Sequence, residues 1–264
     1  TTGPYEVRIA RVYHRPVGGE VAEASHLAPP LSEALRGLEH LAPAEPSRSA
    51  ALGAEIWLYE QAVDGGGREV FLQAQIEAPP GLRGALGAAV EASVLVERSG
   101  GGADVEVDAR LAAERAFAVL DARFALARGE DGAVRRLLGD PDAEVVVLAL
   151  EWLRERDPRA FAGEVVGLLG HADERVAALA IECLGLTGDP GYAGTIIRHA
   201  QPMRRGPMRE VYRSLARLRG AEALGFLRFA AANEDDRALR EEAERALRLA
   251  LTGIVAERGP EIEP

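Results

Sequence analysis

The feature that most constrains the fold is a stretch of sequence that occurs twice. Residues 137–153 read LLGDPDAEVVVLALEWL, and residues 168–184 read LLGHADERVAALAIECL, 31 residues further along the chain. In both copies an aspartate precedes a valine by three residues. Apolar residues then recur three, four, seven and eight positions later, which is the spacing of one helix face. We therefore expect the following residues to be buried between helices, with the alanines allowing close approach: Leu148, Ala149, Leu179, Ala180 and Leu184.

Each of these helical stripes is preceded by a shorter apolar segment, around residues 131–138 and 158–169, so that each unit reads as a helical hairpin. Two further hairpins with weaker sequence similarity follow at residues 189–218 and 221–251. A single hairpin cannot bury its apolar face alone, and repetition at this spacing indicates a stacked solenoid.

Residues 131–251 resemble HEAT repeats of the short bacterial type, also called phycobilisome-lyase-like HEAT repeats. The D-x-x-V-x-x-x-A-x-x-x-L spacing and the Gly-Asp-Pro junctions at 139–141 and 188–190 carry the resemblance. The resemblance implies an architecture in which second helices line the concave surface. It does not imply one activity, because this family includes scaffolds, lyases and hydroxylases.

The N-terminal half changes to an alternation of period two, which is typical of strands. The predicted strands cover residues 5–15, 54–63, 69–78, 90–98 and 104–109. The glycine-rich links DGGG (64–67) and SGGG (99–102) predict hairpins, while residues 31–41 and 110–128 predict helices. We expect Val70, Leu72, Ala74 and Ile76 to face these helices.

The fold class that follows is an α+β N-terminal domain followed by an all-α HEAT-like solenoid of about four helical hairpins. The first domain has an antiparallel sheet with helices on one face and ends in a connecting helix. The predicted bounds are 1–128 for this domain, 129–252 for the solenoid and 253–264 for a C-terminal tail.

The opposite face of the predicted sheet carries aromatic and amide side chains from one hairpin. They are Trp57, Tyr59, Gln61, Phe71, Gln73 and Gln75. Aromatic rings interleaved with amides suit a sugar or an extended peptide. The alternative is that this face packs on the solenoid or on residues 16–30.

Composition excludes several classes of function. The net charge of −11 disfavours nucleic acid as a partner, and all 31 basic residues are arginines, so lysine-dependent phosphate loops and Schiff bases are absent. The single cysteine, Cys183, makes an internal disulfide and a thiolate zinc cluster impossible and is predicted to be a buried structural thiol. We expect no metal or cofactor and no transmembrane segment. The chain begins at Thr1, so we expect upstream residues to have been removed, and cytoplasmic and exported or lipid-anchored locations both stay open.

One segment departs from the acidic character of the chain. Residues 198–219 contain seven arginines and one acid, Glu210, which gives a local charge of +6. Four of the arginines are spaced four residues apart and share a helix face: Arg205, Arg209, Arg213 and Arg217. A like-charged row is mildly destabilising, so it needs an acidic partner or salt bridges to neighbouring second helices, for which Glu182 and Glu241 are the candidates.

The sequence therefore predicts a non-enzymatic protein–protein interaction module, or scaffold, that binds its partner through the solenoid surface. The partner-binding candidates are Arg205, Arg209, Arg213 and Arg217, together with Trp57 and Tyr59. The partner is a protein, and an acidic segment fits the arginines. The alternatives are a HEAT-like lyase or other enzyme with a pocket at the domain junction, and an acidic inhibitor of the immunity type.

Overall fold

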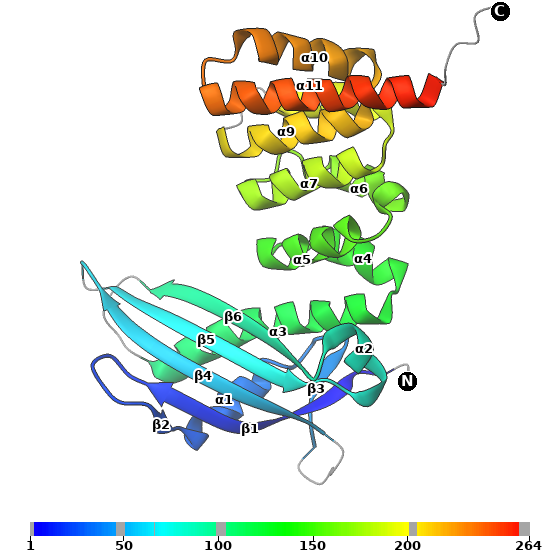
Figure 1. Cartoon of the computed structure of the whole chain (residues 1–264). Coiled ribbons are helices and arrows are strands. Elements are labelled where there is room, and N and C mark those ends of the chain that lie inside the picture. The colour runs from blue at the N-terminus through cyan, green and yellow to red at the C-terminus, as the bar shows by residue number, and fades with distance from the viewer. Residues whose placement is uncertain (1–2, 46–50, 66, 99–103, 201–204, 259–264) are drawn as a thin grey trace, which may run out of the picture. The chain divides into compact units, whose positions relative to one another are not determined.

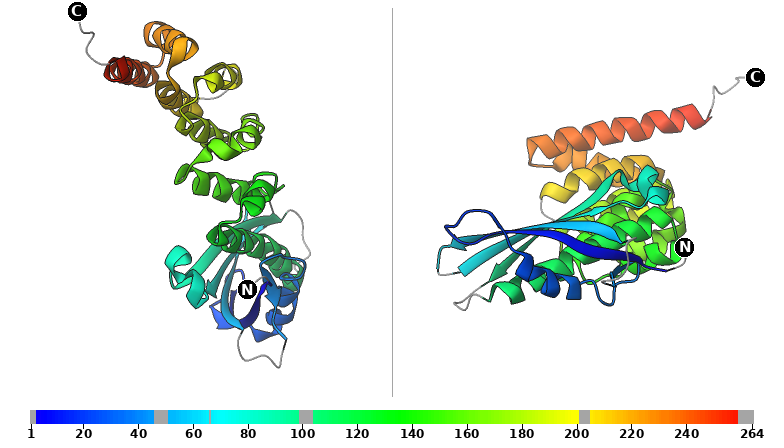
Figure 2. Two further views of the ribbon diagram at one scale, coloured as in Figure 1. Left: turned by 90° about the vertical axis from the view of Figure 1, so that its right-hand side faces the viewer. Right: turned by 90° about the horizontal axis from the view of Figure 1, so that it is seen from below.

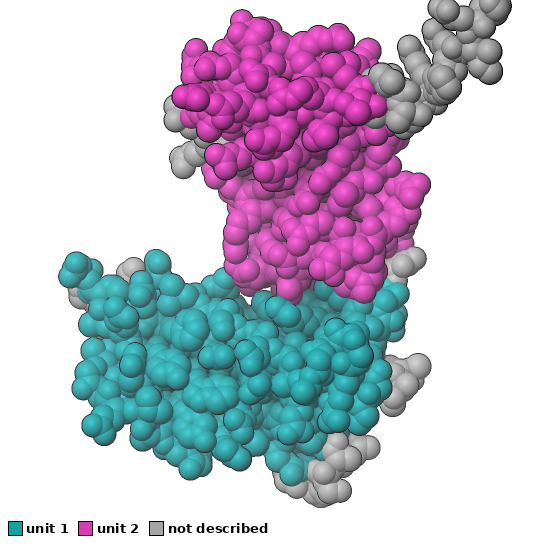
Figure 3. All heavy atoms as spheres, viewed as in Figure 1, with its two compact units in different colours: residues 1–134 teal, residues 135–264 magenta. Residues whose placement is uncertain are grey.

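The computed structural model describes residues 3–45, 51–65, 67–98, 104–200 and 205–258, except for the side chains of 131, 205, 206 and 253–258. The chain divides into two compact units, Thr1–Val134 and Arg135–Pro264 (Figure 3). The division falls inside helix α4 (Asp131–Leu138), a few residues beyond the boundary expected at 128/129.

Unit 1 is built on a six-stranded sheet with the order β2-β1-β4-β5-β6, in which β3 also pairs with β1. Its strands are β1 (Tyr5–Arg15), β2 (Ala22–Glu23), β3 (Leu41–Pro43), β4 (Leu52–Val63), β5 (Gly67–Glu77) and β6 (Ala89–Arg98). The sheet is mixed rather than antiparallel, because β1 runs parallel to both β3 and β4. The chain between β1 and β4 passes through a helix, and crossovers of this kind join parallel neighbours.

A β-bulge in β1 sets which side chains face outward. The pairing with β4 shifts between Ile9 and Arg11, so that Ala10 is an extra residue. Ala10 and Arg11 are consequently both exposed, whereas Val7 before the bulge and Val12 after it are both buried.

Helices cover one face of the sheet. Helix α3 (Val105–Arg128) packs on β5 and β6, and α1 (Ala28–Glu33) packs on α3 and β1 (Figure 1). The residues expected to face the helices, Val70, Leu72, Ala74 and Ile76, are fully buried. The short helix α2 (Arg83–Leu86) lies just before the start of β6.

Two predictions in this half are wrong. Residues 104–109 begin α3 rather than a strand, because the Asp104 carboxylate accepts hydrogen bonds from the backbone N–H groups of Glu106 and Val107 and so caps the helix. The predicted linker 99–102 lies outside the described residues. The helix expected at 31–41 ends at Glu33, and β3 begins at Leu41, where an Asp121 carboxylate oxygen accepts from the Leu41 N–H at 2.8 Å.

Unit 2 is a stack of helical hairpins, as predicted. Its helices are α4, α5 (Ala143–Arg154), α6 (Ala162–Val166), α7 (Glu174–Leu186), α8 (Ala193–Ala200), α9 (Arg205–Leu218), α10 (Gly220–Asn233) and α11 (Arg237–Arg258), and short 3-10 turns precede α6 (Pro158–Phe161) and α8 (Pro190–Tyr192). The second helices α5, α7, α9 and α11 pack on one another in sequence order (Figure 2).

Aspartates that recur in the repeats cap these helices. Asp142 accepts a hydrogen bond from the N–H of Glu144, Asp173 from that of Arg175, and Asp236 from that of Ala238. The aspartate at the start of the D-x-x-V pattern therefore satisfies a backbone donor that the helix leaves free and interacts favourably with the helix dipole.

Small residues lie at the contacts between the second helices. Ala149, Ala180 and Leu184 are fully buried, as expected, but Leu148 and Leu179 are only half-buried. Gly185 of α7 lies against Ser214 of α9, and a Cβ atom at position 185 would be 2.6 Å from the Ser214 Cβ. The α7–α9 contact consequently depends on a glycine that the repeat pattern did not single out.

Ala180→Arg tests the close packing of the second helices. The substitution forces a large charged group into a site with no exposed surface, and we expect a loss of about 4 kcal/mol or of cooperative unfolding altogether. Chemical denaturation followed by circular dichroism measures the change. Ala232→Arg, at an exposed position of α10, is the matched control and should unfold like the parent. Parent-like unfolding of Ala180→Arg would contradict the assigned repeat register.

Candidate binding surfaces

The second helices of unit 2 present one face on which ion pairs join neighbouring helices. Arg175 of α7 pairs with Glu144 of α5 at 2.6 Å, and Arg154 of α5 pairs with Glu182 of α7 at 3.6 Å. These pairs are largely exposed, so each contributes little to stability. Their importance is that they neutralise the charges on this part of the face.

Among the arginines of the α9 row, Arg213 forms ion pairs with glutamates that the structure describes. Arg213 pairs with Glu210 on its own helix at 2.8 Å and with Glu242 of α11 at 2.9 Å. The hydrogen bond to Glu242 raises the pKa of the Arg213 guanidinium above its ordinary value. Glu242 is buried and also pairs with Arg245, so Arg213 belongs to the internal structure.

Arg209 and Arg217 are exposed, and neither forms a hydrogen bond or ion pair with any side chain that the structure describes. The side chain of Arg205, the fourth predicted member, lies outside the described residues. The two glutamates expected to neutralise the row have other partners, since Glu182 pairs with Arg154 and Glu241 with Arg237. Within the described part of the chain, two guanidinium groups, eight residues apart, are therefore available to a ligand.

Exposed leucines lie on the helices beside this row. Leu186 is at the C-terminal end of α7 and is 37% exposed, while Leu249 of α11 is 62% exposed. Helix α9 packs against both of these helices. Sequence reasoning missed this apolar component, although each leucine falls at an outward position of its own helix.

The open face of the sheet in unit 1 carries the second predicted site. Trp57 and Tyr59 are half-buried, and each contacts a neighbouring ring: Trp57 stacks on Tyr13 with the ring centroids 5.9 Å apart, and Tyr59 meets Phe71 at 6.1 Å. In the segment 16–30, the alternative cover for this face, residues 16–23 are all exposed, whereas Ala24 and Leu27 are buried. Within unit 1, the described helices α1 and α3 cover the other face.

A chain of ionic side chains, missed by the sequence analysis, crosses the helix side of this sheet, and all of its members except the exposed Arg98 are largely buried. His14 contacts Glu60 at 3.1 Å, and Arg68 donates to Glu60 at 3.0 Å and also pairs with Asp108. Asp108 pairs in turn with Arg98 at 2.9 Å. The sequence contained a sign of this buried charge, because Glu60 occupies an inward position in the alternation of β4.

Three other histidines, His40, His171 and His199, have structural partners as well. His40 pairs with Asp121, the Nδ1 atom of His171 accepts from the backbone N–H of Asp173, and Nδ1 of His199 lies 2.9 Å from the Thr195 carbonyl oxygen. Within the described residues, histidine, cysteine and acidic side chains do not gather in groups of three or more that could hold a metal ion. The described helices include none with the length and apolar character of a membrane span.

Cys183 is buried, as predicted, and its thiol donates a weak hydrogen bond to the Leu150 carbonyl at 3.4 Å. Burial raises the pKa of the Cys183 thiol to about 12. The thiol is therefore a packing group between α5 and α7 and remains protonated near neutral pH.

Comparison with known proteins bears on unit 2. A family model described as HEAT repeats matches residues 168–248, which extend from just before α7 into α11. The predicted resemblance of the C-terminal half to HEAT repeats is thus confirmed. HEAT repeats generally mediate protein–protein interactions. No curated protein matches the sequence.

The reactivity of Cys183 tests its assigned packing role. We expect no measurable reaction with a disulfide reagent at about pH 8 in the native protein, and complete reaction after unfolding in guanidinium chloride. Because the pKa in the folded state lies above the ordinary value of 9.0, the contribution of this thiol to stability is complete below about pH 9 and declines as the pH rises towards 12. Rapid reaction of the native protein would place the thiol at an accessible site.

Proposed function

We propose that this chain is a non-enzymatic protein-binding module that holds an acidic segment of a partner protein on the second-helix face of unit 2. The observation that carries the proposal is a pair of exposed guanidinium groups on α9, Arg209 and Arg217, which have no hydrogen-bond or ion-pair partner among the side chains that the structure describes. On the same face, Arg154, Arg175 and Arg213 already have carboxylate partners.

The chemistry of the surface defines the partner. Guanidinium groups bind carboxylates through paired hydrogen bonds, and two groups that are two helical turns apart match acidic residues at a similar spacing. Leu186 and Leu249 add apolar contacts on the neighbouring helices. An amphipathic acidic segment with leucine-like side chains between its carboxylates supplies both kinds of contact.

The double variant Arg209→Glu/Arg217→Glu tests the proposed site. The probe is a fluorescein-labelled amphipathic peptide of glutamate and leucine, measured by fluorescence anisotropy with the full chain. We expect at least about tenfold weaker binding, which corresponds to about 1.4 kcal/mol, and an unfolding midpoint close to that of the parent. Binding to the parent should weaken as the salt concentration rises from about 50 to about 300 mM.

Two controls separate this site from general charge effects. Arg198→Glu/Arg228→Glu makes the same change in net charge on the first helices α8 and α10 and should leave binding intact. The same peptide with glutamine in place of glutamate should not bind the parent. Equal losses in the two double variants, or strong binding of the glutamine peptide, would contradict the proposal.

Arg213 provides an internal contrast. Arg213→Gln removes one of the two described arginine partners of the buried Glu242, so we expect lower stability, by about 1 kcal/mol, with the Arg209 and Arg217 site unchanged. Substitution of Arg213 would then change the stability, whereas substitution of Arg209 and Arg217 would change the binding of the peptide.

A further inference from the structure

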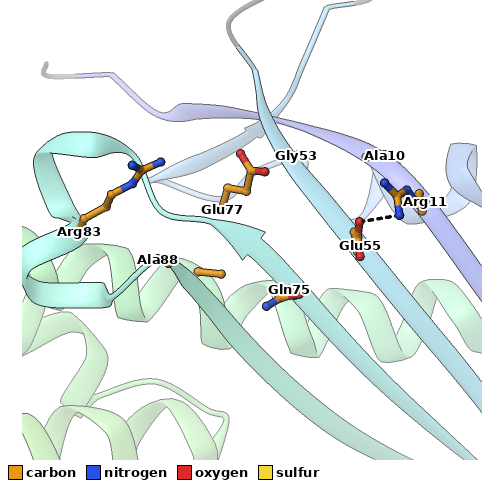
Figure 4. Close-up of a pocket in the computed structure, with 9 residues that line it drawn as sticks. Ala10, Arg11, Gly53, Glu55, Gln75, Glu77, Arg83 and Ala88 are labelled. Carbon is orange, nitrogen blue, oxygen red and sulfur yellow. Dashed lines mark ion pairs between the residues drawn. The ribbon is translucent and has the colours of Figure 1, made fainter.

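The open face of the sheet in unit 1 contains a hollow with a volume of about 590 Å³. Its polar side chains come from four elements, β1, β4, β5 and α2, as Figure 4 shows. They are Arg11, Glu55, Gln75, Glu77 and Arg83. A hollow of this size is in the range of small-ligand sites.

Small residues and the β-bulge create the space. Gly53 of β4 has no side chain, and the nearest group that a Cβ atom would meet there is the Glu77 carboxylate at 3.9 Å. Ala10, the extra residue of the bulge, and two alanines before and at the start of β6, Ala88 and Ala89, complete the lining. The bulge also places Arg11 on the outer face, where it pairs with Glu55 at 3.4 Å.

The polar groups of the hollow combine donors with acceptors and balance in charge. Among the residues that the structure describes, the Glu77 carboxylate has no hydrogen-bond partner, and Arg83 uses only its Nε atom, which donates to the Ala78 carbonyl at 3.2 Å. Gln75 donates to Glu91 at 3.0 Å, which leaves its carbonyl oxygen as an acceptor. Two arginines face two glutamates, so the site favours neither anions nor cations.

An aromatic row lies beside the hollow. The cross-strand register places Arg11, Glu55 and Gln75 in one row, and the next row holds Tyr13 and Trp57. The aromatic rings supply apolar surface, while the adjacent row supplies hydrogen-bonding groups. A ligand that extends from one row to the other needs apolar faces and polar edges.

A sugar and an extended peptide both suit such a surface, and the position of the hollow on the face of the sheet favours the sugar. An extended peptide binds a sheet by adding to its edge, where backbone groups are free. The backbone groups of β4 are engaged with β1 and β5 on either side, so recognition at the hollow depends on side chains. Hydroxyl groups donate and accept at once, which matches the adjacent donors and acceptors.

We propose that this hollow, together with the neighbouring Tyr13 and Trp57, is a binding site for a neutral saccharide. The hydroxyl groups of a sugar would bond to Glu77, Arg83 and Gln75, and the apolar face of an adjoining sugar ring would rest on the aromatic row. This site lies wholly in unit 1 and is independent of the proposed function of unit 2.

Trp57 fluorescence provides the test. In a Trp152→Phe background of the full chain, Trp57 is the only tryptophan. The probes are cellohexaose, chitohexaose and maltohexaose, with an anionic hyaluronan hexasaccharide and the zwitterion glycylglycine for comparison. We expect a saturable fluorescence change with at least one neutral hexasaccharide, with a Kd below about 1 mM, and none with the two charged probes.

Gly53→Val tests the hollow itself. Valine fills the space, and since residue 53 is in a strand, where valine is favoured over glycine, we expect unchanged or higher thermal stability. Saccharide affinity should fall at least about tenfold, whereas Gln61→Ala, at an exposed position further along β4, should keep it. Absence of binding by every neutral hexasaccharide, binding confined to the charged probes, or full binding by Gly53→Val would each overturn the proposal.

Discussion

The close packing of consecutive second helices is the interaction on which the rest of unit 2 depends. Gly185 and Ser214 bring α7 and α9 together without a side chain between them at position 185, and Ala149 and Ala180 are fully buried in the same stack. Because the interior is dense, an added methyl group at such a point has to displace its neighbour. The spacing that results brings charged side chains of adjacent helices within reach of one another.

That spacing allows some charges on the second-helix face to pair between helices, whereas others have no partner among the described side chains. Glu144 meets Arg175 across α5 and α7, and Glu242 meets Arg213 across α9 and α11. The described structure contains no such carboxylate for Arg209 or Arg217. The arginines of α9 therefore do not share one role. Arg213 takes part in the ion pairs between helices, whereas Arg209 and Arg217 are candidates for binding a ligand.

In unit 1 the corresponding constraint is the bulge at Ala10. If Ala10 were paired in regular alternation, without the bulge, Val12 and His14 would be on the solvent side of β1, and Arg11, Tyr13 and Arg15 would be on the helix side. With it, Val12 enters the core, His14 reaches Glu60, and Arg15 lies over the Tyr59 ring. One inserted residue thus produces both the buried ionic chain and the outward row of polar and aromatic side chains.

The sequence by itself determined the elements whose pattern is local. The spacing of the repeats predicted the helical hairpins, and the recurring aspartates became the caps of α5 and α7, because helix periodicity and capping involve residues a few positions apart. Period-two alternation likewise predicted β1, β4, β5 and β6 and the inward face of β5.

Only the tertiary structure decided which distant groups meet. It showed that β1 and β4 run parallel, that residues 104–109 cap and begin a helix, and that Leu148 and Leu179 are only half-buried. It assigned Glu242, rather than Glu241, to Arg213, and it gathered Gly53, Glu77 and Arg83 around one hollow. These outcomes depend on strand register and helix rotation, which the packing of the whole unit sets and which no short stretch of sequence contains.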